Sequence, residues 1–540
     1  MSHPTLSRAG SALLALGFGA AAGFAHPPFD VLPGILGWAG LLWLLDGRGK
    51  AEAERPLRLA FWRAWWFSLA YFLVGTWWVV EAFLVDAEAH GWMAPIIVCV
   101  LPAGMGLFWG SAAVLYRRFT VPGPERLLVF GAAFGLLEWL RNWLLTGFPW
   151  NMAGQTWEAG GAISQNAAVF GALGLTVVTL LIVGAPAVLV GGGSRQARGS
   201  TAAAAAAALL GLWGYGGWRL ANAEVRTTDT RIRIVQANIP QSEKWREGAL
   251  PGIVDAHVRL SQAPGRESVD VVVWPEGALP ASLEYLFDPM SPGAELGRRI
   301  PQSVGDGQHL FMGASRAGPG GAYYLNSLVF LQRQPEGLRV NGFYDKHHLL
   351  PFGEYLPMGE LMTRLGVRSL VNMPSDYAPG PRPAPVALPG LPLLQPIICY
   401  ESIFMGAVGR RGPRPAWIVL PSNDSWFGET SGPWQHLNLG AYRAIEHGIP
   451  IVRATPTGVS AMIDPYGRIR ADQRLGIGRA GVIDADLPAP LSPTLFSRWG
   501  DLPFWFLISA GAFVALLPSL RRAKLAKGVG RRHKGVTHEP

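Results

Sequence analysis

The chain has 540 residues, and its composition is not that of an ordinary soluble protein. Charged residues make up 15% of it, hydrophobic residues make up 49%, and the mean hydropathy is +0.22. A soluble domain carries about 25% charged residues, so much of this chain is expected to lie in a lipid bilayer. The two cysteines, Cys99 and Cys399, are too few for a disulfide framework or a cysteine-rich zinc site.

Apolar segments long enough to cross a bilayer occur about eight times along the chain. Seven precede a stretch of globular composition and one follows it, at roughly residues 11–26, 31–45, 60–80, 93–116, 127–147, 167–191, 201–220 and 503–520. We predict a polytopic α-helical membrane domain in residues 1–228, a soluble domain in residues 229–495, and a last transmembrane helix with a basic cytoplasmic tail in residues 496–540. Small residues at Ala21–Ala25 leave open that the first span is a cleaved signal peptide.

Basic residues are distributed unevenly over the loops between these segments. The loops His26–Asp30, Val85–Gly91 and Phe148–Gln165 carry no Lys or Arg, whereas the alternate loops do. Because cytoplasmic loops are enriched in Lys and Arg, we expect the soluble domain on the outer side of the membrane, opposite the cytoplasm. The residues on the expected cytoplasmic side are Arg8, Arg48, Lys50, Arg55, Arg58, Arg117, Arg118, Arg126, Arg195, Arg198, Arg521, Arg522, Lys524, Lys527, Arg531, Arg532 and Lys534.

The formal net charge of +9 and the isoelectric point near 9.7 raise the question of nucleic-acid binding. The placement of the basic residues argues against it. Many of them flank apolar segments, where they set orientation and contact anionic lipid. The expected partner is therefore the membrane and not a nucleic acid.

The soluble stretch alternates between strand-like and helix-like segments. Val269–Trp274 is a continuous apolar run typical of a buried strand. Similar runs occur at Arg231–Asn238, His309–Gly313, Leu325–Leu331, Leu393–Cys399 and Trp417–Pro421. Residues 252–262 and 435–447 have helical spacing. This order predicts an α/β domain with a layered α-β-β-α architecture.

Three polar residues follow such strands, at the positions where α/β domains place their sites. They are Glu276, Lys346 and Cys399. A carboxylate can take the proton of a thiol, and an ammonium can stabilise an oxyanion formed on a carbonyl, so this set suffices for acyl transfer. Each residue also has an ordinary explanation: Glu276 as an acid at a helix N-terminus, Lys346 as a solvated loop charge and Cys399 as a small buried thiol. The residue types alone do not decide between these interpretations.

Longer motifs around these residues resemble a known family. Three of them resemble the catalytic motifs of the nitrilase, or carbon-nitrogen hydrolase, superfamily: Trp274-Pro-Glu-Gly-Ala-Leu-Pro280, Tyr344-Asp-Lys-His-His-Leu-Leu-Pro-Phe-Gly-Glu-Tyr-Leu-Pro357 and Ile398-Cys-Tyr-Glu-Ser402. The Phe352–Pro357 form and the multi-span architecture resemble the apolipoprotein N-acyltransferases, a membrane branch of that superfamily. Further similar segments are Val235–Gln241 with Trp245, Ser422–Gly428, Arg443–Glu446, Val452–Thr455, Glu138–Arg141 and Thr146–Trp150.

The resemblance implies a nitrilase-like sandwich with Glu276 as general base, Lys346 as oxyanion stabiliser and Cys399 as nucleophile. It also implies supporting roles for Glu354, Tyr400, Glu401, Trp245 and Asn423. The implied acyl donor is a phospholipid, phosphatidylethanolamine, and the implied acceptor is the N-terminal amine of a diacylglyceryl-apolipoprotein. The acyl group would pass through a cysteine thioester, and no metal or other cofactor is implied.

Glu138 and Arg141 are ionisable residues near the outer end of the fifth apolar segment. Charge inside a membrane is costly and usually functional, so these residues, with Trp150, are candidates for binding a lipid headgroup. Alternatively, Glu138 and Arg141 neutralise each other and only stabilise packing, and Trp150 belongs to an interfacial aromatic belt.

Two other functions stay open at this point. The first is a membrane-tethered amidase or nitrilase that hydrolyses a C–N bond with the same three residues, although it does not explain why seven spans precede the domain. The second is a scaffold or transporter with an inactive domain, against which the complete set of Glu276, Lys346 and Cys399 argues.

Overall fold

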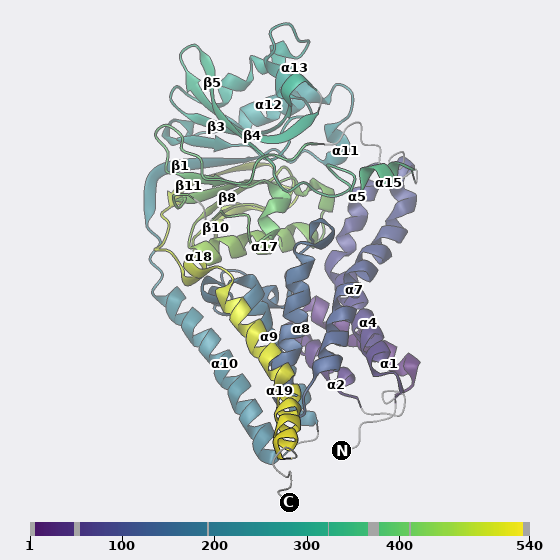
Figure 1. Ribbon diagram of the computed structural model, residues 1–540. Coiled ribbons are helices and arrows are strands. Elements are labelled where there is room, and N and C mark those ends of the chain that lie inside the picture. Colours follow the sequence, from purple (N-terminus) through teal and green to yellow (C-terminus); the bar gives the residue numbers. More distant parts are fainter. Residues whose placement is uncertain are drawn as a thin grey trace, which may run out of the picture.

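The computed structural model describes residues 6–47, 54–191, 194–321, 323–364, 377–409 and 412–532. This part of the chain forms a bundle of helices with a two-sheet sandwich stacked on one end (Figure 1). The sandwich lies in sequence between α10 (Arg195–Ala221) and α19 (Leu502–Arg532). Arg48, Lys50 and Lys534, which the sequence analysis assigned to the cytoplasmic side, lie outside the described residues.

The helical half has an aromatic centre. The ring of Trp38 lies 4.6 Å from that of Trp109 and 4.9 Å from that of Phe67, and such ring pairs add to the burial of apolar surface. Its elements are α1 (Arg8–Phe24), η1 (Leu32–Leu36), α2 (Gly37–Leu45), α4 (Pro56–Thr76), η2 (Trp77–Val79), α5 (Val80–Leu84), α6 (Ala87–His90), η3 (Gly91–Met93), α7 (Ala94–Phe119), α8 (Arg126–Arg141), η4 (Leu144–Thr146), η5 (Ala153–Thr156), η6 (Ile163–Asn166), α9 (Ala167–Val190), α10 and α19.

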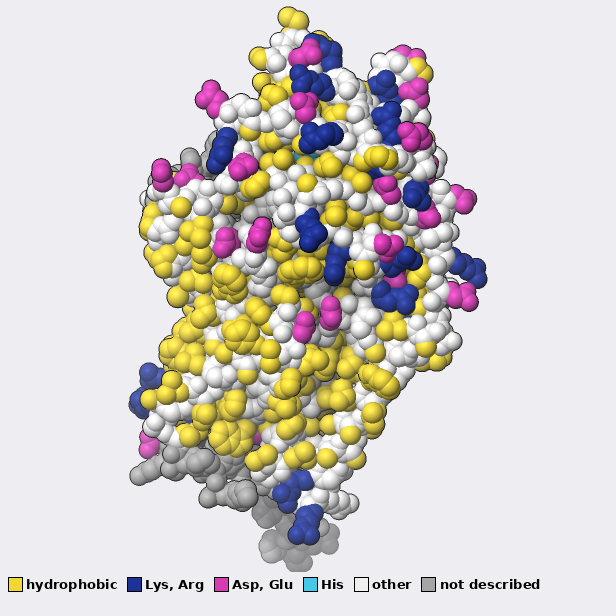
Figure 2. Space-filling model, turned by 180° about the vertical axis from the view of Figure 1, so that it is seen from behind, with side chains coloured by type: hydrophobic (Ala, Val, Ile, Leu, Met, Phe, Trp, Pro, Cys, Tyr) yellow, Lys and Arg dark blue, Asp and Glu magenta, His cyan; other side chains and the backbone are white. Residues whose placement is uncertain are grey.

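Within the described residues, three helical segments are long and apolar enough to cross a membrane: Pro56–Leu84, Ala87–Phe119 and Ile163–Val190. The predicted number of about eight transmembrane helices is therefore not confirmed. Helices do occur near all the predicted positions, but α1, α2 and α8 have only 17, 9 and 16 residues, whereas a bilayer core requires about 20. On the face seen in Figure 2, this half is largely covered by hydrophobic side chains, with Lys and Arg side chains toward the end remote from the sandwich. The surface is that of a membrane protein.

The sandwich consists of a six-stranded sheet in the order β11-β1-β2-β3-β4-β5 and a five-stranded sheet in the order β10-β9-β8-β7-β6. In each sheet three neighbouring strands are parallel and the other pairs are antiparallel. The strands are β1 (Thr227–Gln236), β2 (Val271–Val273), β3 (His309–Ala317), β4 (Tyr324–Gln334), β5 (Gly337–Asp345), β6 (Leu394–Pro396), β7 (Trp417–Pro421), β8 (Ile451–Ala454), β9 (Ser460–Ile463), β10 (Ile469–Leu475) and β11 (Gly481–Pro488).

Hydrophobic clusters define the layers of the sandwich. The cluster between the sheets joins residues such as Val271 and Phe311 of one sheet to Val419 and Val452 of the other. α12 (Ala249–Ser261) packs on the outer face of the six-stranded sheet, and α17 (Gly432–His447) packs on that of the five-stranded sheet. The α-β-β-α sandwich predicted from the sequence is therefore present.

The α17 layer joins the sandwich to the helical half (Figure 1). Tyr442 and Ile445 of α17 belong to one buried cluster with Ala172 and Leu175 of α9. The hydroxyl of Tyr442 donates to the carbonyl of Gly154 at 2.9 Å. The helix α17 thus covers the five-stranded sheet and also packs directly against the helical half.

Candidate active site

Glu276, Lys346 and Cys399 come from three different strands and lie together. Glu276 follows β2, Lys346 directly follows β5, and Cys399 begins the short helix η10 (Cys399–Ile403) after β6. Lys346 Nζ lies 3.0 Å from Glu276 Oε1, and the Cys399 thiol also interacts with the Glu276 carboxylate. All three residues are buried. The two sheets each contribute to this site, because β2 and β5 belong to one sheet and β6 to the other.

Lys346 lies between two carboxylates. Its Nζ is 3.0 Å from Glu276 Oε1 and 3.0 Å from Glu354 Oε1. Asn326 of β4 donates to the same two oxygens, at 2.8 and 2.6 Å. Glu354 Oε2 accepts the N–H of Leu350 at 2.7 Å. Lys346 and Asn326 therefore fix the position of Glu276, while Glu276 Oε2 has no hydrogen-bond partner among the described residues.

The charges of the site follow from these contacts. Burial opposes ionisation of Glu276, but the charge and hydrogen bond of Lys346, aided by Asn326 and Cys399, hold its pKa below the ordinary value. Burial likewise opposes the charge of Lys346, but Glu276 and Glu354 raise its pKa well above the usual range. Burial and the Glu276 charge raise the pKa of Cys399. At neutral pH the site holds a carboxylate, an ammonium and a neutral thiol, so the thiol must lose its proton during attack.

The backbone of Cys399 is strained. Its φ angle is +49°, in the left-handed region that residues other than glycine, asparagine and aspartate seldom adopt. Strain of this kind persists only where surrounding contacts enforce it, and it occurs often at functional sites. The sharp turn between β6 and η10 directs the Cys399 side chain toward Glu276.

Glu401 and Tyr400 connect this turn to its surroundings. Glu401 Oε1 accepts the N–H groups of His347 and His348 at 2.9 and 3.1 Å, and Glu401 Oε2 accepts that of Ile398 at 2.6 Å. The Glu401 carboxylate thereby joins the segment after Lys346 to the segment before Cys399. The hydroxyl of Tyr400 donates to the carbonyl of Gly147 at 2.6 Å, which links the residue after Cys399 to the helical half.

The structure does not bring Trp245 or Asn423 into contact with these charged groups. Trp245 follows α11 (Gln241–Lys244) and is 67% exposed. Asn423 caps η11 (Asp424–Phe427), and its amide lies 3.4 Å from Gln241 Oε1. Their supporting roles stay predictions.

Glu138 and Arg141 of α8 form a buried ion pair inside the helical half. Trp109 Nε1 donates to Glu138 Oε1 at 2.5 Å. Arg141 Nη1 donates to the carbonyls of Phe148 and Trp150 at 2.6 and 2.9 Å. These contacts favour the packing interpretation over a lipid headgroup site, because the charged atoms face protein groups.

Trp150 lies at the seam between the two halves. Its indole N–H donates to Gln435 Oε1 at 2.9 Å, and that of Trp78 donates to the same oxygen at 3.1 Å. Trp150, Trp78 and Tyr400 also belong to one buried cluster. The loop whose carbonyls accept from Arg141 therefore reaches Tyr400, the residue after Cys399.

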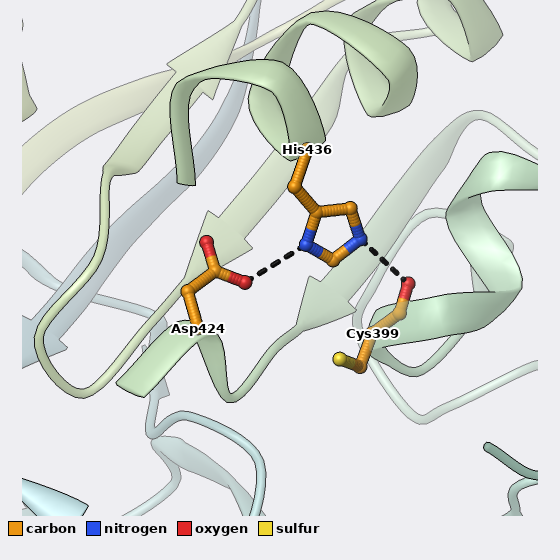
Figure 3. Close-up of side chains that lie close together, drawn as sticks. All are labelled: Cys399, Asp424 and His436. Atoms are coloured by element: carbon orange, nitrogen blue, oxygen red, sulfur yellow. Dashed lines mark hydrogen bonds and ion pairs between the residues drawn. The ribbon is translucent and has the colours of Figure 1, made fainter. Parts of the chain in front are cut away.

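Cys399, Asp424 and His436 also lie close together (Figure 3). His436 Nδ1 is 2.8 Å from Asp424 Oδ1, and Arg453 Nη2 donates to Asp424 Oδ2 at 2.5 Å. His436 Nε2 faces the backbone carbonyl of Cys399 at 3.3 Å. Both ring nitrogens and both carboxylate oxygens thus have protein partners, and the arginine charge opposes a cation. The cluster fits a hydrogen-bond network better than a metal site.

Several residues of the site were missed by sequence reasoning. Asn326 lies within a strand and His436 within a helix, so neither carries a motif that distinguishes it from a structural residue. Lys244 is buried and donates to the carbonyl of Gly277, next to Glu276. Asp424 does lie in the motif Ser422–Gly428, but its partners come from α17 and β8 and could not be known from spacing.

Comparison with known proteins defines the class. Residues 231–491 match the family model "Carbon-nitrogen hydrolase", so the sandwich is a domain of that class. Residues 18–185 match the model "Apolipoprotein N-acyltransferase N-terminal domain". The presence of both domains in one chain indicates a membrane-bound member of the carbon-nitrogen hydrolases.

Whole-chain relatives give the family. The chain is 48% identical to the apolipoprotein N-acyltransferase of Caulobacter vibrioides, with 96% of this chain and 97% of that protein covered. It is 38% identical to that of Rhodopseudomonas palustris, with 95% of each covered, and 36% identical to that of Brucella melitensis, with 92% of each covered. The chain belongs to the apolipoprotein N-acyltransferase family, and it is an acyltransferase enzyme. This confirms the family predicted from the sequence.

Proposed function

We propose that this protein transfers a fatty acyl chain from a phospholipid, phosphatidylethanolamine, to the N-terminal amine of S-diacylglyceryl-cysteine apolipoprotein through a Cys399 thioester. Lipoprotein N-acylation follows from the family to which the chain belongs. The observation that carries the mechanism is the convergence of an ionised carboxylate, an ammonium and a neutral thiol within one buried site. A tethered amidase is not favoured, because it leaves the helical half without a purpose.

In the first half-reaction Glu276 takes the thiol proton while Cys399 Sγ attacks the ester carbonyl of the phospholipid. The oxyanion of the tetrahedral intermediate is stabilised by Lys346 Nζ. The N–H of Tyr400, which belongs to the peptide that follows Cys399, would be a second donor to this oxyanion. The intermediate collapses, protonated Glu276 gives its proton to the leaving alkoxide, and lysophospholipid departs.

In the second half-reaction the lipoprotein amine attacks the thioester carbonyl. Glu276 accepts a proton from the amine, the C–S bond breaks, and Glu276 returns this proton to the leaving Cys399 sulfur as the amide product departs. Glu354 keeps Lys346 in place throughout, since Nζ lies 3.0 Å from each carboxylate. The site therefore returns to its starting protonation after each cycle, which is a ping-pong scheme.

The helical half would anchor the site at the membrane surface, where its phospholipid substrate lies. The ends of α7 and α8 that flank one loop expected in the cytoplasm, and the first turn of α10, lie at the pole remote from the sandwich (Figure 1). By the positive-inside rule the sandwich then faces the periplasm of a bacterial inner membrane, where lipoproteins await acylation. The boundaries at residues 228 and 495 and the set of about eight spans are part of this proposal.

Intact mass spectrometry tests the function. The purified protein in detergent micelles is incubated with phosphatidylethanolamine that carries a labelled acyl chain, and a diacylglyceryl peptide is then added. We expect a mass increase of one acyl chain that is removed by hydroxylamine and discharged onto the peptide. Cys99→Ser should keep this behaviour and Cys399→Ser should abolish it. Release of free fatty acid without transfer to the peptide would support a hydrolase instead.

Thiol labelling tests the orientation. In a cysteine-free background, Ala384→Cys places a thiol at an exposed position of the sandwich, and Gln196→Cys places one at an exposed position in the first turn of α10. A membrane-impermeant maleimide should label the first in intact spheroplasts and the second only after lysis. The opposite pattern would place the site in the cytoplasm and contradict the proposed orientation.

A further inference from the structure

His348 lies where the segment after Lys346 meets the helical half. Its ring nitrogen Nε2 is 2.8 Å from the backbone carbonyl oxygen of Thr146, in η4. The ring also lies nearly flat against that of Phe404, with 3.8 Å between the ring centroids and 23° between the ring planes. Phe404 directly follows η10, the short helix that Cys399 begins. A side chain two residues from Lys346 therefore contacts both the turn that carries Cys399 and the helical half.

The loop that accepts this hydrogen bond is itself held tightly. Its backbone has φ angles of +53° at Leu145, +75° at Thr146 and +81° at Gly147, and residues other than glycine keep such angles only where surrounding contacts enforce them. Three consecutive carbonyls of the loop accept side-chain donors from three different elements: that of Thr146 from His348, that of Gly147 from Tyr400 and that of Phe148 from Arg141. The loop is thus a fixed point of the helical half.

The tautomer of His348 follows from its surroundings. Burial lowers the pKa of His348, and the hydrogen bond to Thr146 offsets this only in part, so the ring carries one proton at neutral pH. A carbonyl oxygen only accepts hydrogen bonds, and this proton therefore lies on Nε2. In the described part of the chain no carboxylate is bonded to Nδ1 and competes for it. Neutral His348 is a donor to the Thr146 carbonyl.

Lys346 and Cys399 require a connection of this kind because they belong to different sheets. Lys346 follows β5 of the six-stranded sheet, and Cys399 follows β6 of the five-stranded sheet, so strand pairing does not fix one relative to the other. Glu401 joins the two segments at one point, where its carboxylate accepts backbone N–H groups from both. One attachment leaves a segment free to turn about it, and a second attachment removes that freedom.

We propose that His348 is a positioning residue of the acyl transfer: through Thr146 and Phe404 it supplies the second attachment, which holds Lys346 in place opposite Cys399. The inference rests on the proposed function for the role of Lys346 at the oxyanion. The helical half then does more than anchor the site, because its loop carbonyl sets where the ammonium stands relative to the sulfur. Loss of this attachment should slow a reaction that forms an oxyanion and should spare a reaction of the same thiol that forms none.

Two reactions of the purified full-length protein in detergent separate these effects. The protein carries Cys99→Ser, so that Cys399 is its single thiol. The first reaction is acylation of Cys399 by p-nitrophenyl butyrate, which passes through an oxyanion and is followed by the release of p-nitrophenolate. The second is alkylation by iodoacetamide, a displacement at a saturated carbon that forms no oxyanion. Neither reaction requires a phospholipid or a lipoprotein.

His348→Leu keeps apolar volume against Phe404 but removes the donor to Thr146. It should slow acylation by about tenfold and leave alkylation within about twofold of the parent, since small misplacements of reacting groups cost up to about 100-fold. His348→Gln should restore acylation to within about threefold of the parent, because its amide nitrogen reaches about as far as Nε2 and can donate to the carbonyl. If His348→Leu does not fold, His348→Asn, which is polar but too short to reach Thr146, should show the same loss.

The matched control is His309→Leu. His309 is another histidine whose Nε2 lies 3.1 Å from a backbone carbonyl, that of Pro389. It begins β3, whereas Glu276 lies beyond the opposite end of the neighbouring parallel strand β2. This variant should leave both rates at the parent values. An equal loss of acylation here, or an equal loss of acylation and alkylation in His348→Leu, would show general destabilisation and refute the proposal.

Two other outcomes would also overturn the role of His348. Acylation at the parent rate in His348→Leu would mean that the attachment is not needed. Equal losses in His348→Gln and His348→Leu would mean that the donor to Thr146 is not what matters. A parent that is acylated by p-nitrophenyl butyrate but not by phospholipid would refute the proposed function alone and would leave the comparison of these variants intact.

Discussion

Among the buried clusters of oppositely charged side chains in this molecule, one in each half can be compared directly. In the helical half, Glu138 and Arg141 pair on α8. In the sandwich, Glu276 and Glu354 flank Lys346. Both clusters are almost fully withdrawn from solvent, so burial and charge do not distinguish them.

The hydrogen bonds do distinguish them. Each carboxylate oxygen of Glu138 has a donor, Trp109 for one and Arg141 for the other. Glu276 has donors on Oε1 but none on Oε2 within the described residues, and a thiol lies beside it. A buried ion pair with all oxygens paired holds structure together, whereas one that keeps a free acceptor beside a nucleophile can move a proton. The predictions below test that distinction.

The largest effect is expected for Glu276→Gln. Glutamine keeps the shape and can still contact Asn326 and Lys346, but it cannot take the thiol proton. Loss of a general base costs about 10²- to 10⁴-fold, so the rate of thioester formation should fall by about 10³-fold with little change in thermal stability. Rapid-quench mass spectrometry with labelled phospholipid measures the rate. Acyl-enzyme formation at the parent rate would assign the base to Glu354 or Glu401 instead.

For Arg141→Met we expect the opposite: a large loss of thermal stability with little direct effect on the reaction rate. This change leaves the Glu138 carboxylate unpaired and removes a donor from the carbonyls of Phe148 and Trp150. Breaking a buried ion pair costs about 3–5 kcal/mol, so the thermal midpoint in detergent should fall markedly. The matched variant Arg141→Met with Glu138→Gln should recover part of this loss because no charge is left unpaired. A normal thermal midpoint with a raised KM for phospholipid would support the lipid-headgroup interpretation.

Most of this difference in hydrogen bonding could not be predicted from the sequence. The strands before Glu276 and Cys399 could be predicted because buried strands are continuous apolar runs, and the family motifs supplied the roles. Asn326 and His436 could not, because their partners depend on how β4 faces β5 and how α17 lies across η10. The number of membrane spans was also uncertain from sequence, since apolar length predicts neither where a helix breaks, as between η1 and α2, nor how much of it is lipid-exposed.

A smaller, pH-dependent effect is expected for Asn326→Ala. If Glu276 is the base, its ionised form is the active one, and the rate then rises as pH increases through the pKa of Glu276, which lies below its ordinary value of 4.5. Asn326 donates to the ionised carboxylate at 2.8 Å, and loss of this donor favours the protonated form. The acid limb of Cys399 alkylation should therefore move to higher pH by about one unit, which corresponds to about 1.4 kcal/mol.

Asn341→Ala is the control for that experiment. Asn341 lies on β5 and donates to Gln332 Oε1 at 3.2 Å, away from the three carboxylates and the lysine of the site. Its removal should leave the acid limb in place. An equal shift in both variants would mean that the limb reports unfolding and not the ionisation of Glu276.

The smallest effect is expected for Cys99→Ser. Cys99 is exposed on α7 within a segment apolar enough to span the membrane, whereas Cys399 is buried at a strained turn between charged groups. A surface substitution away from special features changes stability by less than about 0.5 kcal/mol, and a serine hydroxyl within a helix can donate to the carbonyl four residues earlier. The thermal midpoint in detergent and the rate of acyl transfer should both match the parent. A loss of transfer comparable to that of Cys399→Ser would contradict the assignment of the nucleophile and would require the helical half to contribute chemistry as well as position.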